Sequence, residues 1–226
     1  MFATVVPTGI RSLDAILGGG YPPKSTILVF GTPDAGKEGI GYWFTQSGLL
    51  QGDLCVYASR LSVREVTDDM KGFGVYLGQE TPYWISSRGG QVKLDLMDIL
   101  SFSVALKEIA KRNSERRIRI VTDVLSPLLV LNPLDNIYRL ISSLFADLKQ
   151  YDVVLLATLD EGMHDQKTLS SMQELFDGII EYRLYEESLK VLPLIRIRKM
   201  RGTAPRTNYF NVSFAQNGME VTPYVK

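Results

Sequence analysis

A glycine-rich segment that contains one lysine carries the strongest chemical signal in this sequence. The segment is Gly31-Thr32-Pro33-Asp34-Ala35-Gly36-Lys37-Glu38. It follows the pattern of a phosphate-binding loop, in which glycines let backbone N–H groups surround a phosphate while the lysine neutralises its charge. All eight residues are therefore candidates for nucleotide binding, with ATP or ADP as the expected ligand. The last position of the pattern is Ser or Thr, whose hydroxyl binds Mg²⁺, but here it is Glu38.

The carboxylate of Glu38 leaves several interpretations open. At about 4 Å from a phosphate charge it would cost roughly 4 kcal/mol at an effective dielectric constant near 20, enough to weaken binding about a thousand-fold. Glu38 could instead ligate Mg²⁺ itself, since carboxylate oxygens suit that ion, or turn away from the phosphates. It could also occupy the anion site together with Asp34 and pair with Lys37, because an acid in the first turn of a helix is stable without a ligand.

Asp123 is the candidate for metal binding, acting through water if Mg²⁺ binds. It directly follows the apolar run 118–122, which we expect to be a strand next to the one that precedes the loop. An acid at the carboxyl end of such a strand is typical of a residue that holds Mg²⁺ in P-loop proteins. Strands also end in Asp at ordinary turns, so the pattern alone is a weak signal.

The elements that must position these residues belong to an α/β fold. Short β-rich runs alternate with segments of helical period, which predicts a mostly parallel sheet flanked by helices. We expect parallel strands at 26–30, 54–58, 83–87, 118–122 and 153–158, and helices over 37–51, 63–71, 99–113 and 137–148. Strands at 179–185, 192–197, 209–214 and 219–222 are expected to be antiparallel. Residues 1–226 are predicted to form a single domain.

Composition limits the classes of function. The 25 Lys and Arg balance the 25 Asp and Glu, so no overall basic field indicates a nucleic acid or an anionic membrane as partner. The single cysteine, Cys55, favours a reducing compartment, and the first ten residues lack the basic start and apolar run of a signal peptide. We therefore expect a cytoplasmic protein with no membrane segment.

Three segments resemble the RecA-superfamily ATPases of the KaiC type. The family's opening is similar to Thr8-Gly9-Ile10-Arg11-Ser12-Leu13-Asp14 followed by Leu17-Gly18-Gly19-Gly20. Its Walker B segment is similar to Asp123–Leu128, and its K-M-R-G turn is similar to Ile197–Thr203. The resemblance is to the single-domain KaiC-like P-loop ATPases. It implies a RecA-like core that assembles into rings with ATP between neighbouring subunits.

The resemblance also assigns roles to individual residues. Lys199 and Arg201 match the pair that reaches the neighbour's γ-phosphate, although without the family match they would be interpreted as a solvated basic turn. Thr158 is either a sensor of the γ-phosphate or an ordinary strand-end threonine. The family places one or two glutamates after the second strand to polarise the attacking water, whereas this chain has Ser59 and Arg60 there. The active site is thus degenerate at two positions.

Three functions follow from these observations. The first is a nucleotide-binding protein with impaired or absent hydrolysis, a pseudo-ATPase that acts as a regulatory or assembly subunit by self-association or in a hetero-oligomer with an intact paralogue. The second is an active Mg²⁺-dependent ATPase in which Glu38 ligates the metal and Asp160 or Glu161 activates water. The third is an interaction scaffold that binds no nucleotide.

Overall fold

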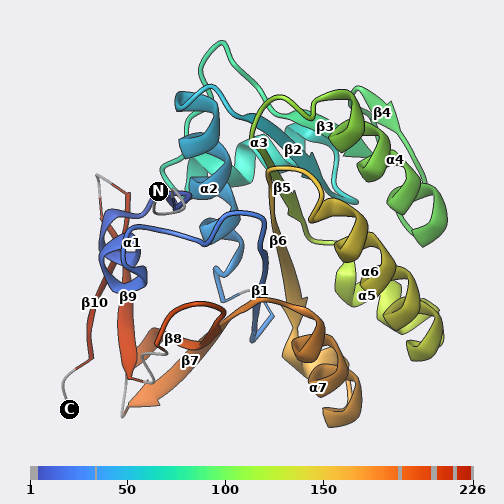
Figure 1. The fold of residues 1–226 in the computed structure, drawn as a ribbon. Coiled ribbons are helices and arrows are strands. Elements are labelled where there is room, and N and C mark those ends of the chain that lie inside the picture. Colours follow the sequence, from blue (N-terminus) through green and yellow to red (C-terminus); the bar gives the residue numbers. More distant parts are fainter. Residues whose placement is uncertain (1–4, 34, 188–189, 205–207, 216–217, 225–226) are drawn as a thin grey trace.

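A sheet of ten strands runs through the molecule in the order β10-β9-β8-β7-β1-β6-β5-β2-β3-β4 (Figure 1). The structure is a computed structural model that describes residues 5–33, 35–187, 190–204, 208–215 and 218–224. None of the helices in these ranges is long and apolar enough to cross a membrane.

The parallel part of the sheet contains the strands that lead to the predicted site. It comprises β1 (Thr26–Gly31), β2 (Leu54–Ala58), β3 (Tyr83–Ser86), β4 (Val92–Lys93), β5 (Ile118–Thr122), β6 (Val153–Asp160) and β7 (Gly178–Glu187). All six residues of β1 are buried, as expected of a strand that helices cover on both faces.

Helices cover both faces of this sheet. On one face lie α4 (Ile99–Arg112), α5 (Leu125–Leu131), α6 (Leu134–Leu148) and α7 (Gln166–Leu175), whose apolar side chains form one core cluster. On the other face lie α1 (Arg11–Leu17), α2 (Glu38–Leu50) and α3 (Val63–Gly72), which belong to a second cluster. Figure 1 shows these two groups on opposite sides of the sheet.

The chain ends in an antiparallel meander. It continues from β7 through β8 (Lys190–Met200), β9 (Tyr209–Ala215) and β10 (Gly218–Pro223). The predicted fold class, a mostly parallel α/β sheet with antiparallel C-terminal strands, is confirmed.

Four details of the prediction need correction. The strand at 179–185, expected to be antiparallel, pairs parallel with β1 on one side and antiparallel with β8 on the other. The expected position of the Asp123 strand was wrong, because β6 lies between β5 and β1. The strand predicted to end at Thr158 continues to Asp160. The helices α1, α5 and α7 and the short strand β4 were not predicted. The first two of these helices contain seven residues each, too few to show a helical period clearly.

Candidate functional site

A cleft of about 480 Å³ lies at the carboxyl ends of the central strands. The phosphate-loop motif borders it, since Gly31 ends β1 and Glu38 begins α2. Four acidic residues and one basic residue line the cleft: Glu38, Asp69, Asp123, Asp160 and Arg60. The carboxyl edge of a parallel sheet is where α/β proteins bind ligands. The structure thus brings the two predicted sites, the loop and Asp123, to one cleft.

Glycine is required at two positions of the loop. A Cβ on Gly31 would lie 1.8 Å from the carbonyl oxygen of Tyr182 on β7, and Gly36 has a φ of +91°. Thr32 donates its N–H to that same Tyr182 carbonyl at 3.4 Å. The loop is therefore supported closely by β7. Asp34, which the sequence placed among the binding residues, lies outside the described residues.

Lys37 is engaged by two carboxylates. Its Nζ lies 2.8 Å from Oε1 of Glu38 and 2.6 Å from Oδ1 of Asp160, and the residue is 1% exposed. Burial acts to lower the pKa of Lys37, but the charges and hydrogen bonds of Glu38 and Asp160 outweigh burial and raise it. The amine therefore stays charged, and its charge is already met by two acids of the same chain. This is the pairing that the sequence left open for Glu38, with Asp160 as the second acid.

Asp123 is held by the turn that follows β2. Ser59 donates its hydroxyl to Oδ2 of Asp123 at 2.6 Å. Burial raises the pKa of Asp123 to about 6, although the Ser59 hydrogen bond and the nearby backbone and charge of Arg60 act to lower it. The predicted metal-binding acid thus follows its strand as expected but accepts a hydrogen bond from a protein group.

These side chains do not form a set of donors that fits Mg²⁺. The ion requires near-octahedral oxygen ligands and retains several waters. Here the Glu38 carboxylate pairs with Lys37, and the Asp123 carboxylate accepts from Ser59. No group of three or more His, Cys, Asp or Glu residues in the described part of the chain is arranged to hold a metal ion.

Thr158 lines the same cleft from β6 and is buried. It lies two residues before the end of its strand, while Asp160 at that end contacts Lys37. Its role as a sensor of the γ-phosphate stays a prediction.

Lys199 and Arg201 lie at the opposite end of the sheet. Nη1 of Arg201 pairs with Oδ1 of Asp177 at 2.6 Å, and Lys199 donates its Nζ to the Phe176 carbonyl at 2.6 Å. Asp177 also accepts the N–H of Thr26, the first residue of β1. The loop begins at the other end of β1, about 16 Å away at 3.3 Å per residue. This pair therefore lies at the far end of β1 from its own cleft, and its role toward a neighbouring subunit stays a prediction.

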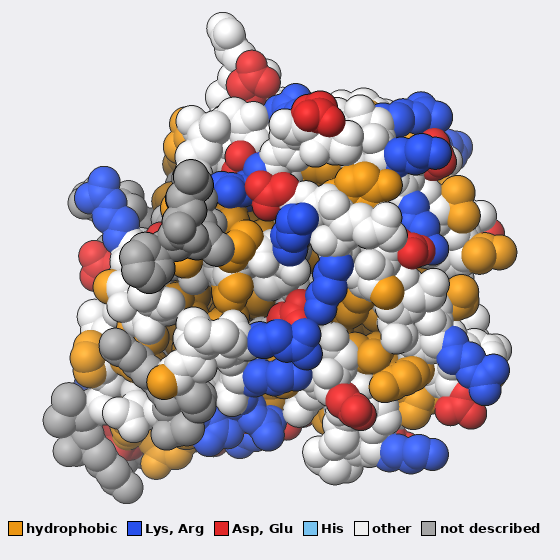
Figure 2. Space-filling view, viewed as in Figure 1, with side chains coloured by type: hydrophobic (Ala, Val, Ile, Leu, Met, Phe, Trp, Pro, Cys, Tyr) orange, Lys and Arg blue, Asp and Glu red, His pale blue; other side chains and the backbone are white. Residues whose placement is uncertain are grey.

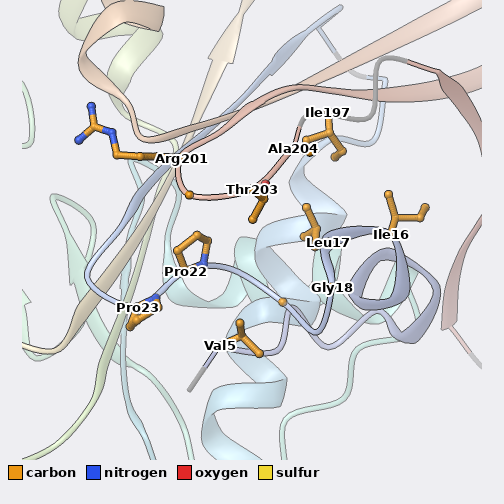
Figure 3. Close-up of a pocket in the computed structure, with 12 residues that line it drawn as sticks. Val5, Ile16, Leu17, Gly18, Pro22, Pro23, Ile197, Arg201, Thr203 and Ala204 are labelled. Carbon is orange, nitrogen blue, oxygen red and sulfur yellow. The ribbon is translucent and has the colours of Figure 1, made fainter. Parts of the chain in front are cut away.

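The turn that contains Arg201 borders an apolar pocket of about 540 Å³ (Figure 3). Leu17 and Gly18 from the opening segment line this pocket together with Ile197 and Thr203 from the turn. Figure 3 shows the Arg201 guanidinium directed away from these side chains. Two of the segments that carried the family resemblance are thus neighbours in space.

On the face that Figure 2 draws, Lys and Arg side chains gather in a band, although the total charge is zero.

Sequence analysis missed two buried residues that support the site. Arg119 on β5 is fully buried, pairs with Asp53 at 2.7 Å and donates to the carbonyls of Pro7 and Phe44, which ties the opening segment and α2 to the sheet. The only sequence signal for a buried role of Arg119 was that it is the single charged residue in the apolar run 118–122. Tyr182 is also fully buried, with its hydroxyl beside Gly36. No sequence pattern indicated it.

A parallel sheet with this glycine-rich loop between its central strand and α2 defines a P-loop protein with a RecA-like core. The chain matches the family described as "ATPase: KaiC" over residues 6–226. It therefore belongs to the KaiC ATPase family.

Individual relatives agree with this assignment. The chain is 23% identical over 225 residues to the circadian clock protein KaiC2 of Synechocystis sp., covering 96% of this chain but only 39% of that protein. It is 23% identical over 241 residues to a UPF0273 protein of Thermotoga maritima, covering 96% of both. The crystal structure of a KaiC-like protein from Pyrococcus horikoshii OT3 has the same fold, with a TM-score of 0.78 and 21% identity over 97% of this chain and 99% of that one.

Proposed function

We propose that this chain is a nucleotide-binding member of the KaiC family with impaired or absent ATP hydrolysis, and that it acts as a regulatory or assembly subunit. The double pairing of Lys37 supports this proposal most directly. A phosphate that enters the loop must displace Glu38 or Asp160 from the lysine, or bind beside them. Either route weakens binding relative to a loop that ends in Ser or Thr.

The turn after β2 supports the loss of hydrolysis. Ser59 and Arg60 stand where the family resemblance implies glutamate. Neither can act as a general base toward water at neutral pH, because a serine hydroxyl is a very weak base and a guanidinium stays protonated. The Ser59 hydroxyl is moreover directed to Asp123.

An active ATPase is the second candidate, and the position of Asp160 favours it. Asp160 lines the cleft and contacts Lys37, so it could activate water if nucleotide binding released it. The scaffold that binds no nucleotide is the third candidate. We further propose that residues 1–226 act as one domain in the cytoplasm, where the single buried Cys55 stays reduced.

Binding and turnover of ATP separate these candidates. We expect the wild-type protein to bind a fluorescent ATP analogue weakly and to hydrolyse ATP little above background. Glu38→Gln should bind at least about ten-fold more tightly, since it removes a carboxylate from beside the phosphate site. The matched control is Glu108→Gln on α4, which lies outside the cleft and should leave affinity unchanged.

Restoring both altered positions tests the loss of hydrolysis. Glu38→Thr combined with Ser59→Glu should raise the turnover rate well above that of either single variant. Rapid turnover by the wild type, abolished by Asp160→Asn, would instead support the active ATPase. No binding by the wild type or by Glu38→Gln would support the scaffold.

A further inference from the structure

We propose that Arg60 supplies the positive charge that Mg²⁺ supplies in other P-loop proteins, so that the cleft binds a nucleoside di- or triphosphate without metal. This inference rests on the proposed function, because it requires that the cleft binds nucleotide.

Arg60 is a cation at the edge of the cleft. Its side chain is exposed and lines the cavity. The nearby arginines Arg64 and Arg88 pair with Asp68 and Glu65, whereas the Arg60 guanidinium forms no ion pair with any residue that the structure describes. A planar guanidinium with several N–H donors matches the geometry of phosphate oxygens. Arg60 is thus available to an anionic ligand.

Hydrogen bonds hold the turn around Arg60. The N–H of Leu61, the next residue, donates to the Ser59 hydroxyl at 3.1 Å. The same hydroxyl bonds to Asp123 at 2.6 Å. Because the backbone of this turn is held by hydrogen bonds, the Arg60 side chain can reach the cleft without reorganisation of the turn.

The groups that would hold Mg²⁺ are closed off by the same contacts. The Ser59 hydroxyl donates a hydrogen bond to one carboxylate oxygen of Asp123, and the Lys37 amine forms an ion pair with the Glu38 carboxylate. The charge changes have opposite signs, and their sum is positive. Relative to a loop with Ser or Thr at position 38 and glutamate after β2, Glu38 adds one negative charge, but Arg60 with Ser59 removes at least one and adds a positive charge. In this cleft the Arg60 guanidinium, which is part of the chain, therefore takes the place of a bound Mg²⁺ ion.

Nucleotide binding measured with and without metal tests this inference. We would titrate the purified protein with a fluorescent ATP analogue and with ADP, in excess MgCl₂ and in excess EDTA. Affinity should be the same within about two-fold in both conditions. Arg60→Gln should weaken binding in EDTA by about ten-fold or more, the loss expected when a charge-assisted phosphate contact is removed.

Arg64→Gln is the matched control. Arg64 lies on α3 with a side chain 92% exposed and does not line the cleft, so its loss should change affinity by less than about two-fold. Arg60→Lys should recover part of the binding, and circular dichroism should show all variants folded with the same melting behaviour.

Two results would overturn the inference while leaving the proposed function intact: affinity that collapses in EDTA, or affinity that Arg60→Gln does not alter. A wild-type protein that binds no nucleotide in either condition would overturn both.

Discussion

Asp123 keeps its proton over a pH range in which most aspartates are ionised. Burial raises its pKa to about 6 from an ordinary value of 3.8. The folded state therefore binds this proton more tightly than the unfolded state does. Its stabilising contribution is complete below about pH 3.8 and is lost as the pH rises through about 6. At neutral pH the fold holds a partly buried carboxylate at a cost.

Asp123→Asn should accordingly stabilise the protein at neutral pH. An asparagine oxygen can still accept from the Ser59 hydroxyl, and the side chain is never charged. At about 1.4 kcal/mol per pKa unit, the shift from 3.8 to about 6 predicts a gain of about 3 kcal/mol in the free energy of unfolding at pH 7.5, and little at pH 4. Urea unfolding at the two pH values measures it. A gain of equal size at both would contradict the shifted pKa.

The helix that follows the loop shows why element packing can oppose helix propensity. Gly39, Gly41 and Gly48 interrupt α2, and glycine in a helix costs about 1 kcal/mol relative to alanine. A Cβ on each would lie 2.7 Å from Phe73, 2.8 Å from Val121 and 2.5 Å from Cys55, respectively. These glycines therefore allow α2 to approach its neighbours closely.

Gly48→Ala and Gly72→Ala should change stability in opposite directions. At Gly48 the added methyl meets the buried Cys55 and Arg119 side chains, so overpacking should lower the free energy of unfolding by about 1–3 kcal/mol. At Gly72, the last residue of α3, no heavy atom lies within 4 Å of the added Cβ, and helix propensity should raise it by about 0.5–1 kcal/mol. Thermal or urea unfolding measures both. Stabilisation by Gly48→Ala would show that α2 is not tightly packed.

Much of the fold was predictable because strand and helix periods are local properties. The strands at 54–58 and 118–122 have the predicted bounds. The order of strands is not local, and so β6 was not expected between β1 and β5. The second partner of Lys37, Asp160, was not predicted for the same reason. Gly31 and Asp160 are register partners on β1 and β6, and this pairing carries an acid from a distant segment to the loop. The sequence indicated the loop and Asp123 but not the contacts that engage them.

At the scale of the whole molecule, the two features that the family resemblance singled out lie at opposite ends of one sheet. The cleft lies at the carboxyl ends of the parallel strands, while Lys199 and Arg201 lie where β1 begins, beside Asp177. A head-to-tail contact joins two different surfaces and closes into a ring when the rotation allows it. Self-association or mixed assembly with an intact paralogue would use both ends.

Mixing experiments test that arrangement. We predict that a catalytically intact KaiC-family ATPase will show a higher turnover rate when mixed with this protein, since basic side chains such as Lys199 and Arg201 can stabilise the charge on a neighbour's γ-phosphate. Lys199→Ala combined with Arg201→Ala should abolish the gain, while Glu108→Gln should retain it. An unchanged turnover rate on mixing, together with no co-elution, would rule out the mixed assembly.

The pairing of Glu38 with Lys37 places a competing anion within the phosphate loop itself. Because the two residues are consecutive, the carboxylate competes for the amine at a fixed effective concentration. Dilution cannot remove it, and no second molecule is needed to deliver it. Competition between this carboxylate and a phosphate for Lys37 is therefore intramolecular, and substitution of residue 38 alone would remove it.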